Sequence, residues 1–286
     1  MLRAARRGRS SLPDAARVAA FLAGSWLPDG GFPDRSGKSD LYYTVFGLQC
    51  LSALDADLPA ATVRRYLDAV GDGPSLDLVH LGCLLRCWST LPPPTPAGLV
   101  PSILARVESH RSADGGYHVV PGAMTGSAYA CFLALAAYQD AGAELPDRAG
   151  MVRCLHGLDT PDGAFSGDLG IVGGVTPVTA AAVAVLAELG EPVPQESVAC
   201  LLSRSTAEGG FLAAQGAPMP DLLSTATALH ALAMAGAAFD NIRPACRTFV
   251  EGLWSDHGGF RGHTGDETLD AEYTFYGLLA LGHVGG

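Results

Sequence analysis

Six stretches of the chain are apolar around the whole circumference of a helix, which predicts helices that are buried on every side. They cover residues 41–48, 78–84, 128–135, 180–186, 226–232 and 273–281. Between them lie stretches such as 61–68 and 198–204, which carry charge on one face only and therefore predict amphipathic helices at the outside. The pattern leaves no stretch with the alternation and flanking turns of a β-strand. The chain is predicted to be all-α.

A turn made of glycines and an aromatic residue recurs between the outer and the inner helices. The spacings between the first glycines of these turns are 85, 48, 46 and 49 residues. The glycines are Gly30, Gly115, Gly163, Gly209 and Gly258. Because the first spacing is nearly twice the others, a degenerate unit is expected near residue 71. Six units of roughly 40–50 residues lie within the range of known repeat architectures.

The last unit predicts that the helix pairs close into a ring. An open stack needs terminal units with a polar outer face, whereas the last inner helix is as apolar as those in the middle. We therefore predict an α/α toroid with six helix pairs. Its inner helices are expected to begin near Asp40, Asp77, Thr125, Thr176, Asp221 and Leu269. Residues 13–286 are predicted to form this single domain, and residues 1–12 a flexible basic tail.

Composition and charge narrow the class of protein. Hydrophobic residues make up 48% of the 286 residues, enough for a sizeable core. The net charge of −11 disfavours nucleic acid, since the only basic run is Arg3, Arg6, Arg7 and Arg9. No apolar stretch predicts a signal peptide or a membrane span. Seven scattered cysteines are typical of reduced, buried thiols, so a cytoplasmic location is expected.

Two segments carry a resemblance to a known superfamily. Residues 30–44 read Gly-Gly-Phe-Pro-Asp-Arg-Ser-Gly-Lys-Ser-Asp-Leu-Tyr-Tyr-Thr, and residues 273–281 read Tyr-Thr-Phe-Tyr-Gly-Leu-Leu-Ala-Leu. With the repeated turns, they resemble the α/α-toroid superfamily of protein prenyltransferase β subunits and squalene cyclase-like terpenoid cyclases. The resemblance implies a central cavity that takes an isoprenoid or similarly apolar substrate.

The resemblance also implies roles for residues of the first two units. Arg35, Lys38 and Tyr43 fall on positions that contact a prenyl diphosphate in the transferases. Asp40 falls on a zinc ligand, and His80, within Asp-Leu-Val-His, falls on another. Zinc, and magnesium with a diphosphate, are therefore the two cofactors that the resemblance leaves open.

The sequence departs from both branches of the superfamily. Tyr42 stands where the transferases have a zinc-binding cysteine, and Asp270 stands where they have a histidine that contacts the diphosphate. The Asp-x-Asp-Asp acid motif that is typical of terpenoid cyclases does not occur in the sequence.

The same residues also have simpler interpretations. Arg35 and Lys38 fit either an anion site at a helix start or an ordinary charged loop. Asp40 fits a metal ligand, a general acid or base, or a helix cap. His80 shares a helix face with Cys83 and Cys87, and a cavity-lining histidine without metal is favoured over a metal cluster.

Aromatic and acidic residues complete the candidate site. Seven aromatic residues fit both an aromatic cavity lining and ordinary core packing, namely Tyr42, Tyr43, Phe46, Trp88, Tyr129, Tyr273 and Tyr276. Asp270 and Glu272 are two residues apart at a helix start, so one is expected to cap the helix and the other to face the cavity.

The leading hypothesis is an enzyme that acts on a prenyl diphosphate or a similarly apolar substrate. Arg35, Lys38 and Tyr43 would hold a diphosphate, while Asp40, His80 and Asp270 would handle protons. Three alternatives stay open. They are a metal-free isoprenoid or natural-product cyclase, a zinc-dependent prenyltransferase β subunit with an α-type partner, and a non-catalytic lipid-binding or scaffold toroid. A homo-oligomer also stays open.

Overall fold

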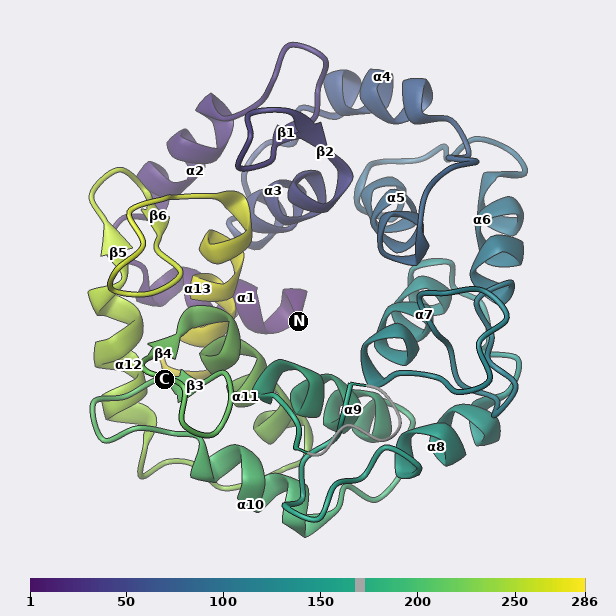
Figure 1. Cartoon of the computed structure of the whole chain (residues 1–286). Coiled ribbons are helices and arrows are strands. Elements are labelled where there is room, and N and C mark those ends of the chain that lie inside the picture. The colour runs from purple at the N-terminus through teal and green to yellow at the C-terminus, as the bar shows by residue number, and fades with distance from the viewer. Residues whose placement is uncertain (168–172, 286) are drawn as a thin grey trace.

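The computed structural model describes residues 1–167 and 173–285, and its helices form two concentric rings (Figure 1). The inner ring consists of α3 (Leu41–Ala53), α5 (Leu78–Thr90), α7 (Ala128–Asp140), α9 (Thr176–Glu188), α11 (Leu222–Met234) and α13 (Ala271–Val284). The outer ring consists of α2 (Ala15–Gly24), α4 (Ala60–Val70), α6 (Leu99–Glu108), α8 (Arg148–His156), α10 (Gln195–Ser203) and α12 (Arg243–Gly252). The predicted α/α toroid is confirmed.

The first and last repeats lie side by side and close the ring (Figure 1). On the inner side, the Tyr42 hydroxyl of α3 donates to a carboxylate oxygen of Glu272 in α13 at 2.6 Å. On the outer side, the Arg17 guanidinium of α2 donates to the Asp256 carbonyl of the last repeat at 2.8 Å. Residues far apart in the sequence therefore meet where the ring closes.

The glycine–aromatic turns fix where the inner helices begin. Their aromatic rings are fully buried, with exposed fractions of 0–2% for Phe32, Tyr117, Phe165, Phe211 and Phe260. The Phe211 amide donates to the Thr225 hydroxyl of α11 at 2.9 Å, and three other turns repeat this bond. At Gly277 a Cβ atom would lie 2.5 Å from the Phe260 ring, so the close approach of ring and helix requires glycine.

Three of these turns contain short antiparallel strand pairs, where the sequence predicts no strand. The pairs are β1 (Phe32–Pro33) with β2 (Ser39–Asp40), β3 (Phe211–Leu212) with β4 (Pro220–Asp221), and β5 (Trp254–Ser255) with β6 (Gly259–Phe260). Each strand has only two residues, which is too short to show an alternating pattern.

Replacing Phe211 by alanine is expected to lower the free energy of unfolding by about 3–5 kcal/mol, since the ring is fully buried and its loss leaves a cavity. Urea unfolding followed by circular dichroism measures the change. Met219→Ala in the following loop is the control, because this side chain is 43% exposed and should cost little. Equal losses in the two variants would contradict the role of the turn.

The first residues form helix α1 (Leu2–Gly8) and a 3₁₀ turn, η1 (Arg9–Ser11), where a flexible tail is predicted. Ala4, Ala5 and Gly8 are buried against α13. The backbones approach so closely that a Cβ atom on Gly282 would lie 1.8 Å from the Ala4 carbonyl oxygen. The N-terminal end of the helix lies near the centre of the ring (Figure 1). Small residues thus dock this basic segment on the ring. None of the described helices is long and apolar enough to cross a membrane.

Candidate functional site

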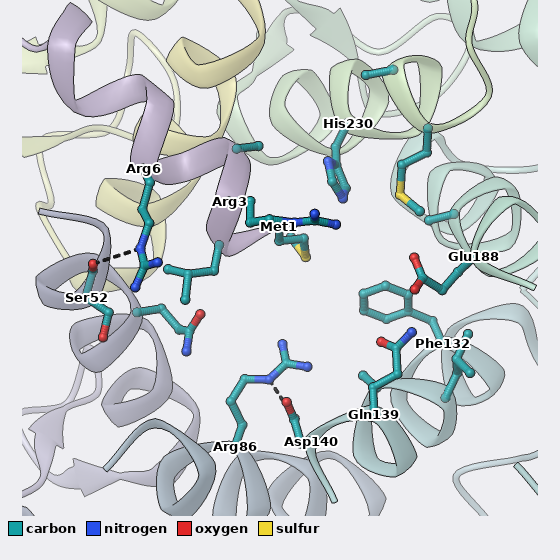
Figure 2. Close-up of a pocket in the computed structure, with 18 of the residues that line it drawn as sticks. Met1, Arg3, Arg6, Ser52, Arg86, Phe132, Gln139, Asp140, Glu188 and His230 are labelled. Carbon is teal, nitrogen blue, oxygen red and sulfur yellow. Dashed lines mark hydrogen bonds and ion pairs between the residues drawn. The ribbon is translucent and has the colours of Figure 1, made fainter. Parts of the chain in front are cut away.

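The ring encloses two adjoining hollows. The mouth chamber, of about 680 Å³, lies where the inner helices end and is lined by Gln49, Ser52, Arg86, Asp140, Glu188 and His230, among others (Figure 2). The aromatic pocket, of about 120 Å³, lies deeper and is lined by Tyr42, Phe46, Tyr129, Phe132, Phe275 and Tyr276. Phe132, Gln49 and Arg86 line both hollows, so the two are continuous. The larger volume is in the usual range for small-molecule sites.

The aromatic pocket has a packed wall of rings. The Phe46 ring lies 4.9 Å from that of Tyr42 and 5.5 Å from that of Tyr276, measured between ring centroids. Four of the seven aromatic residues predicted as a lining, Tyr42, Phe46, Tyr129 and Tyr276, line this pocket. Tyr43, Trp88 and Tyr273 are not among its lining residues, and the Arg35 guanidinium lies 5.4 Å from the Tyr273 ring centroid.

Glu272 connects to the aromatic pocket through Tyr42. The Tyr42 hydroxyl donates to Glu272 Oε1 at 2.6 Å, while Asp270 caps α13 by accepting from the Tyr273 amide. Burial, supported by the neighbouring Asp270 carboxylate, raises the pKa of Glu272. Burial, together with the charge of Glu272, also raises the pKa of Tyr129 to about 12. One acid of this pair therefore caps the helix, and the other faces the pocket lining.

Arg35 is held by two carboxylates across the closing seam of the ring. Its Nε and Nη2 donate to Asp270 Oδ2 at 3.1 and 3.0 Å, and Nη2 also donates to Asp266 at 3.1 Å. Lys38 lies exposed on the turn between β1 and β2. The two cations predicted to hold a diphosphate therefore differ in their surroundings: Arg35 is paired with acids and Lys38 faces solvent.

Asp40 and His80 meet at the start of α3 and α5. Asp40 caps α3 through the Tyr42 and Tyr43 amides, and its Oδ2 lies 3.4 Å from His80 Nε2. The other ring nitrogen, Nδ1, lies 2.7 Å from Asp77 Oδ1. The hydrogen bond to Asp40, with Asp77 adding to it, raises the pKa of His80 to about 9. The imidazole is therefore a cation between two carboxylates at neutral pH.

These donors do not fit zinc. A zinc-binding imidazole needs a free lone pair, and both nitrogens of His80 face carboxylates. Burial raises the pKa of Cys83 to about 12, which disfavours the thiolate form that zinc binds. Among the described residues, no group of three His, Cys, Asp or Glu side chains could hold a metal ion. Asp266 and Asp270 do not form a magnesium site either, because both carboxylates already pair with Arg35.

The His80 ion pairs predict a pH-dependent stability. Because the folded-state pKa of about 9 exceeds the ordinary value of 6.5, the contribution is fully present below pH 6.5 and is lost as the pH rises through 9. An NMR titration of the His80 ring should show the raised pKa, and Asp40→Asn should lower it. Asp57→Asn, on an exposed residue, is the control. A His80 pKa that does not change in Asp40→Asn would contradict the pairing.

The mouth chamber contains charged residues that the sequence analysis does not assign to a site. Arg3, Arg6 and Arg7 reach it from α1, and Arg86 pairs with Asp140 at 2.7 Å between Nε and Oδ2 (Figure 2). The feature of the sequence that could indicate these residues is Arg86 itself, an isolated charge in an apolar inner helix. The three α1 arginines have no such signal, because their position follows only from the docking of α1.

His230 also lines the mouth chamber. Its Nδ1 lies 3.1 Å from Nε2 of His283, and burial lowers the pKa of His230 to about 3. The pair is therefore neutral at physiological pH, with one ring donating a hydrogen bond to the other.

A closed ring of helix pairs around an aromatic-lined hollow defines an α/α-toroid protein. The chain belongs to the prenyltransferase alpha-alpha toroid domain family, whose model matches residues 2–81, 97–176 and 178–282. A sequence comparison with curated proteins finds no match.

Several solved structures share the fold. A variant of the type II terpene cyclase MstE from Scytonema, bound to its substrate geranylgeranyl dihydroxybenzoate, has a TM-score of 0.67 at 14% identity, covering 98% of this chain and 97% of that one. Protein geranylgeranyltransferase-I from Candida albicans, bound to GGPP, has a TM-score of 0.52 at 14% identity, covering 96% and 80%. An α-1,6-mannanase from Salegentibacter has a TM-score of 0.63 at 13% identity, covering 95% and 98%. At these identities the likeness is one of fold alone, and the fold hosts several chemistries.

Proposed function

We propose that the chain takes an isoprenoid-bearing substrate into the ring and catalyses its cyclisation by proton transfer, without a metal. The observation that carries this proposal is the aromatic pocket with Glu272 hydrogen-bonded to its Tyr42 wall. Aromatic faces stabilise cations, and a buried carboxyl with a raised pKa is suited to donate a proton. The type II terpene cyclase among the structural neighbours supports the same class of substrate.

The proton would reach the substrate through Tyr42. In the reactive form Glu272 is protonated and donates to the Tyr42 oxygen, the reverse of the hydrogen bond described above. As the Tyr42 hydroxyl gives its proton to a terminal double bond, the Glu272 carboxyl replaces it. The resulting tertiary carbocation is attacked by the next double bond, which closes a ring and moves the charge along the chain. Loss of a proton from the last cation to solvent forms a new double bond, and Glu272 regains a proton from solvent. The substrate is therefore isomerised, and no co-reactant is consumed.

In this proposal Asp40, His80 and Asp270 position the site, and they do not take the catalytic roles that the sequence predicts for them. Asp40 and Asp270 cap α3 and α13, the helices that carry Tyr42 and Glu272. The Asp40–His80 pair holds the start of α3 against the start of α5, and the Asp270–Arg35 pair holds the start of α13 against the β1–β2 turn across the seam. The donor sets described above also make a zinc-dependent transferase the less supported alternative.

A non-catalytic lipid-binding toroid is the second candidate. It is favoured by the engagement of Arg35 and His80 in ion pairs, which leaves these two predicted site residues without a free charge for chemistry. The aromatic pocket would then hold an apolar tail without changing it.

Incubation of the purified chain with geranylgeranyl substrates in D₂O separates these candidates. Protonation predicts a cyclic product that carries one deuterium from solvent and, from a diphosphate substrate, retains the diphosphate. Release of diphosphate would instead indicate ionisation or transfer and would contradict the proposal. Binding without any product would favour the lipid-binding toroid.

A further inference from the structure

We propose that the arginines of the mouth chamber bind the anionic headgroup of the substrate, a diphosphate or a carboxylate, while its isoprenoid tail enters the aromatic pocket. This inference rests on the proposed function and adds to it the charge and the orientation of the substrate. It is carried by the charges of the chamber, by their unused hydrogen-bond donors and by the acidic character of the opposite end of the ring.

The mouth chamber concentrates positive charge in an acidic protein. Arg3, Arg6, Arg7 and Arg86 line it, while its described carboxylates are Asp140 and Glu188. The chain as a whole carries a net charge of −11. In Figure 2 the Arg86 guanidinium points toward the centre of the hollow, with Arg3 on the opposite side. An anion in this chamber would therefore lie between guanidinium groups from two separate elements, α1 and α5.

Most donors of these guanidinium groups are not used by the fold. Arg6 Nε donates to the Ser52 carbonyl at 3.3 Å, and Arg7 Nε donates to the Gly282 carbonyl at 3.2 Å. Arg86 likewise uses its Nε, toward Asp140. Within the described part of the chain, Arg3 has no hydrogen bond or ion pair through its guanidinium. Since each guanidinium has five N–H donors, several remain for an oxyanion, which arginine binds in a bidentate way.

The ends of the inner helices explain part of this arrangement without a ligand. Exposed carbonyl groups at helix C-termini attract cations, and Ser52 and Gly282 lie in the last turns of α3 and α13. That role accounts for one N–H of Arg6 and one of Arg7. It does not account for Arg3, nor for Arg86, whose guanidinium contacts a side chain and points into the hollow.

The opposite end of the ring is a poor place for an anion. There Arg35 is already paired with Asp266 and Asp270, and Asp40 and Asp77 flank His80. A headgroup in the mouth chamber sends the tail past Phe132, which lines both hollows, toward Tyr42. The far end of the tail then lies beside the Tyr42–Glu272 pair, where the proposed proton transfer needs a terminal double bond.

Binding measurements with three probes that share one tail test the inference. The probes are geranylgeranyl diphosphate, geranylgeranoic acid and geranylgeraniol, titrated by calorimetry into the full chain. Diphosphate or carboxylate should bind at least about tenfold more tightly than the alcohol, and the comparison of the two anions shows which headgroup the chamber prefers. Added salt should weaken the binding of the two anionic probes and leave the binding of the alcohol unchanged.

The variants are chosen so that folding does not decide the result. Arg3→Gln removes an exposed side chain, and Arg86→Gln with Asp140→Asn removes both members of the ion pair, so no buried charge loses its partner. Each of these variants is expected to raise the Kd of the anionic probe about tenfold or more, and the Kd of the alcohol by less than twofold. Arg9→Gln is the matched control, because Arg9 belongs to the same basic run but pairs with Asp55 and does not line the chamber.

Two outcomes would overturn the inference while the proposed function stands. One is equal affinity for the alcohol and both anions. The other is a loss of anion affinity in Arg35→Gln or Lys38→Gln but not in the chamber variants, which would place the headgroup at the opposite end. If none of the three probes binds, the proposed function fails and this inference fails with it.

Discussion

Replacing Glu272 by glutamine is expected to lower turnover of a cyclising substrate by about 10²–10⁴-fold, the usual contribution of a positioned general acid. Glutamine keeps the shape of the side chain and can still accept the 2.6 Å hydrogen bond from Tyr42, but it has no acidic proton to return. Substrate affinity should change little, because Glu272 contacts the wall of the aromatic pocket rather than the tail. The measurement is the rate of deuterium-labelled product formation at saturating substrate.

Two variants make this result specific. Glu267→Gln removes an exposed acid from the neighbouring loop and should leave turnover unchanged. Tyr42→Phe removes the hydroxyl that passes the proton and should lower turnover as well, without removing a ring from the pocket. Turnover of Glu272→Gln within about twofold of the unmodified chain would exclude this residue as the acid.

The pH profile gives an independent readout of the same group. A general acid works in its protonated form, so turnover should fall as the pH rises through the pKa of Glu272, which burial raises. Asp270→Asn removes a neighbouring negative charge that contributes to this shift, and should move the fall to lower pH. It also removes one of the two carboxylates that pair with Arg35, so the stability of this variant has to be measured alongside.

The fold could be predicted from the sequence because each repeat carries local signals of its structure. Glycine–aromatic turns have buried rings, and the Asp residues at 40, 77 and 221 cap the helices predicted to begin there. The third and last inner helices are capped by Ser127 and Asp270, within two residues of the predicted starts. Such signals need no knowledge of distant contacts.

The candidate site was only partly predictable, because its charges are paired across the ring. Arg35 looks like an anion-binding residue in sequence, and its pairing with Asp270 depends on how the first and last repeats align. The basic run looks like a tail, and only the approach of Ala4 to Gly282 places its arginines over the hollow. The aromatic lining could be predicted more fully from the sequence, since Tyr42 and Tyr276 lie on helices that were predicted to be internal.

Replacing Gly82 by leucine, which fills part of the aromatic pocket, is expected to weaken binding of the isoprenoid tail by more than about 100-fold. Gly82 lines the pocket on α5, and a Cβ atom there would meet no atom within 4 Å. Gly82→Leu therefore adds a side chain in open space, in place of one isoprene unit of the tail. Losing burial of about five carbons at about 0.8 kcal/mol each corresponds to more than two orders of magnitude in Kd.

The same substitution should not unfold the protein, which separates the pocket from the core. Leucine is a better helix former than glycine, so the free energy of unfolding should stay the same or rise by up to about 1 kcal/mol. Gly24→Leu is the matched control, because Gly24 lies on outer helix α2, is also free of atoms within 4 Å and lines neither hollow. If Gly82→Leu folds normally and binds geranylgeraniol as tightly as Gly24→Leu does, the tail does not occupy the aromatic pocket. The catalytic assignment of Tyr42 and Glu272 would then fail as well, since both act on a substrate held there.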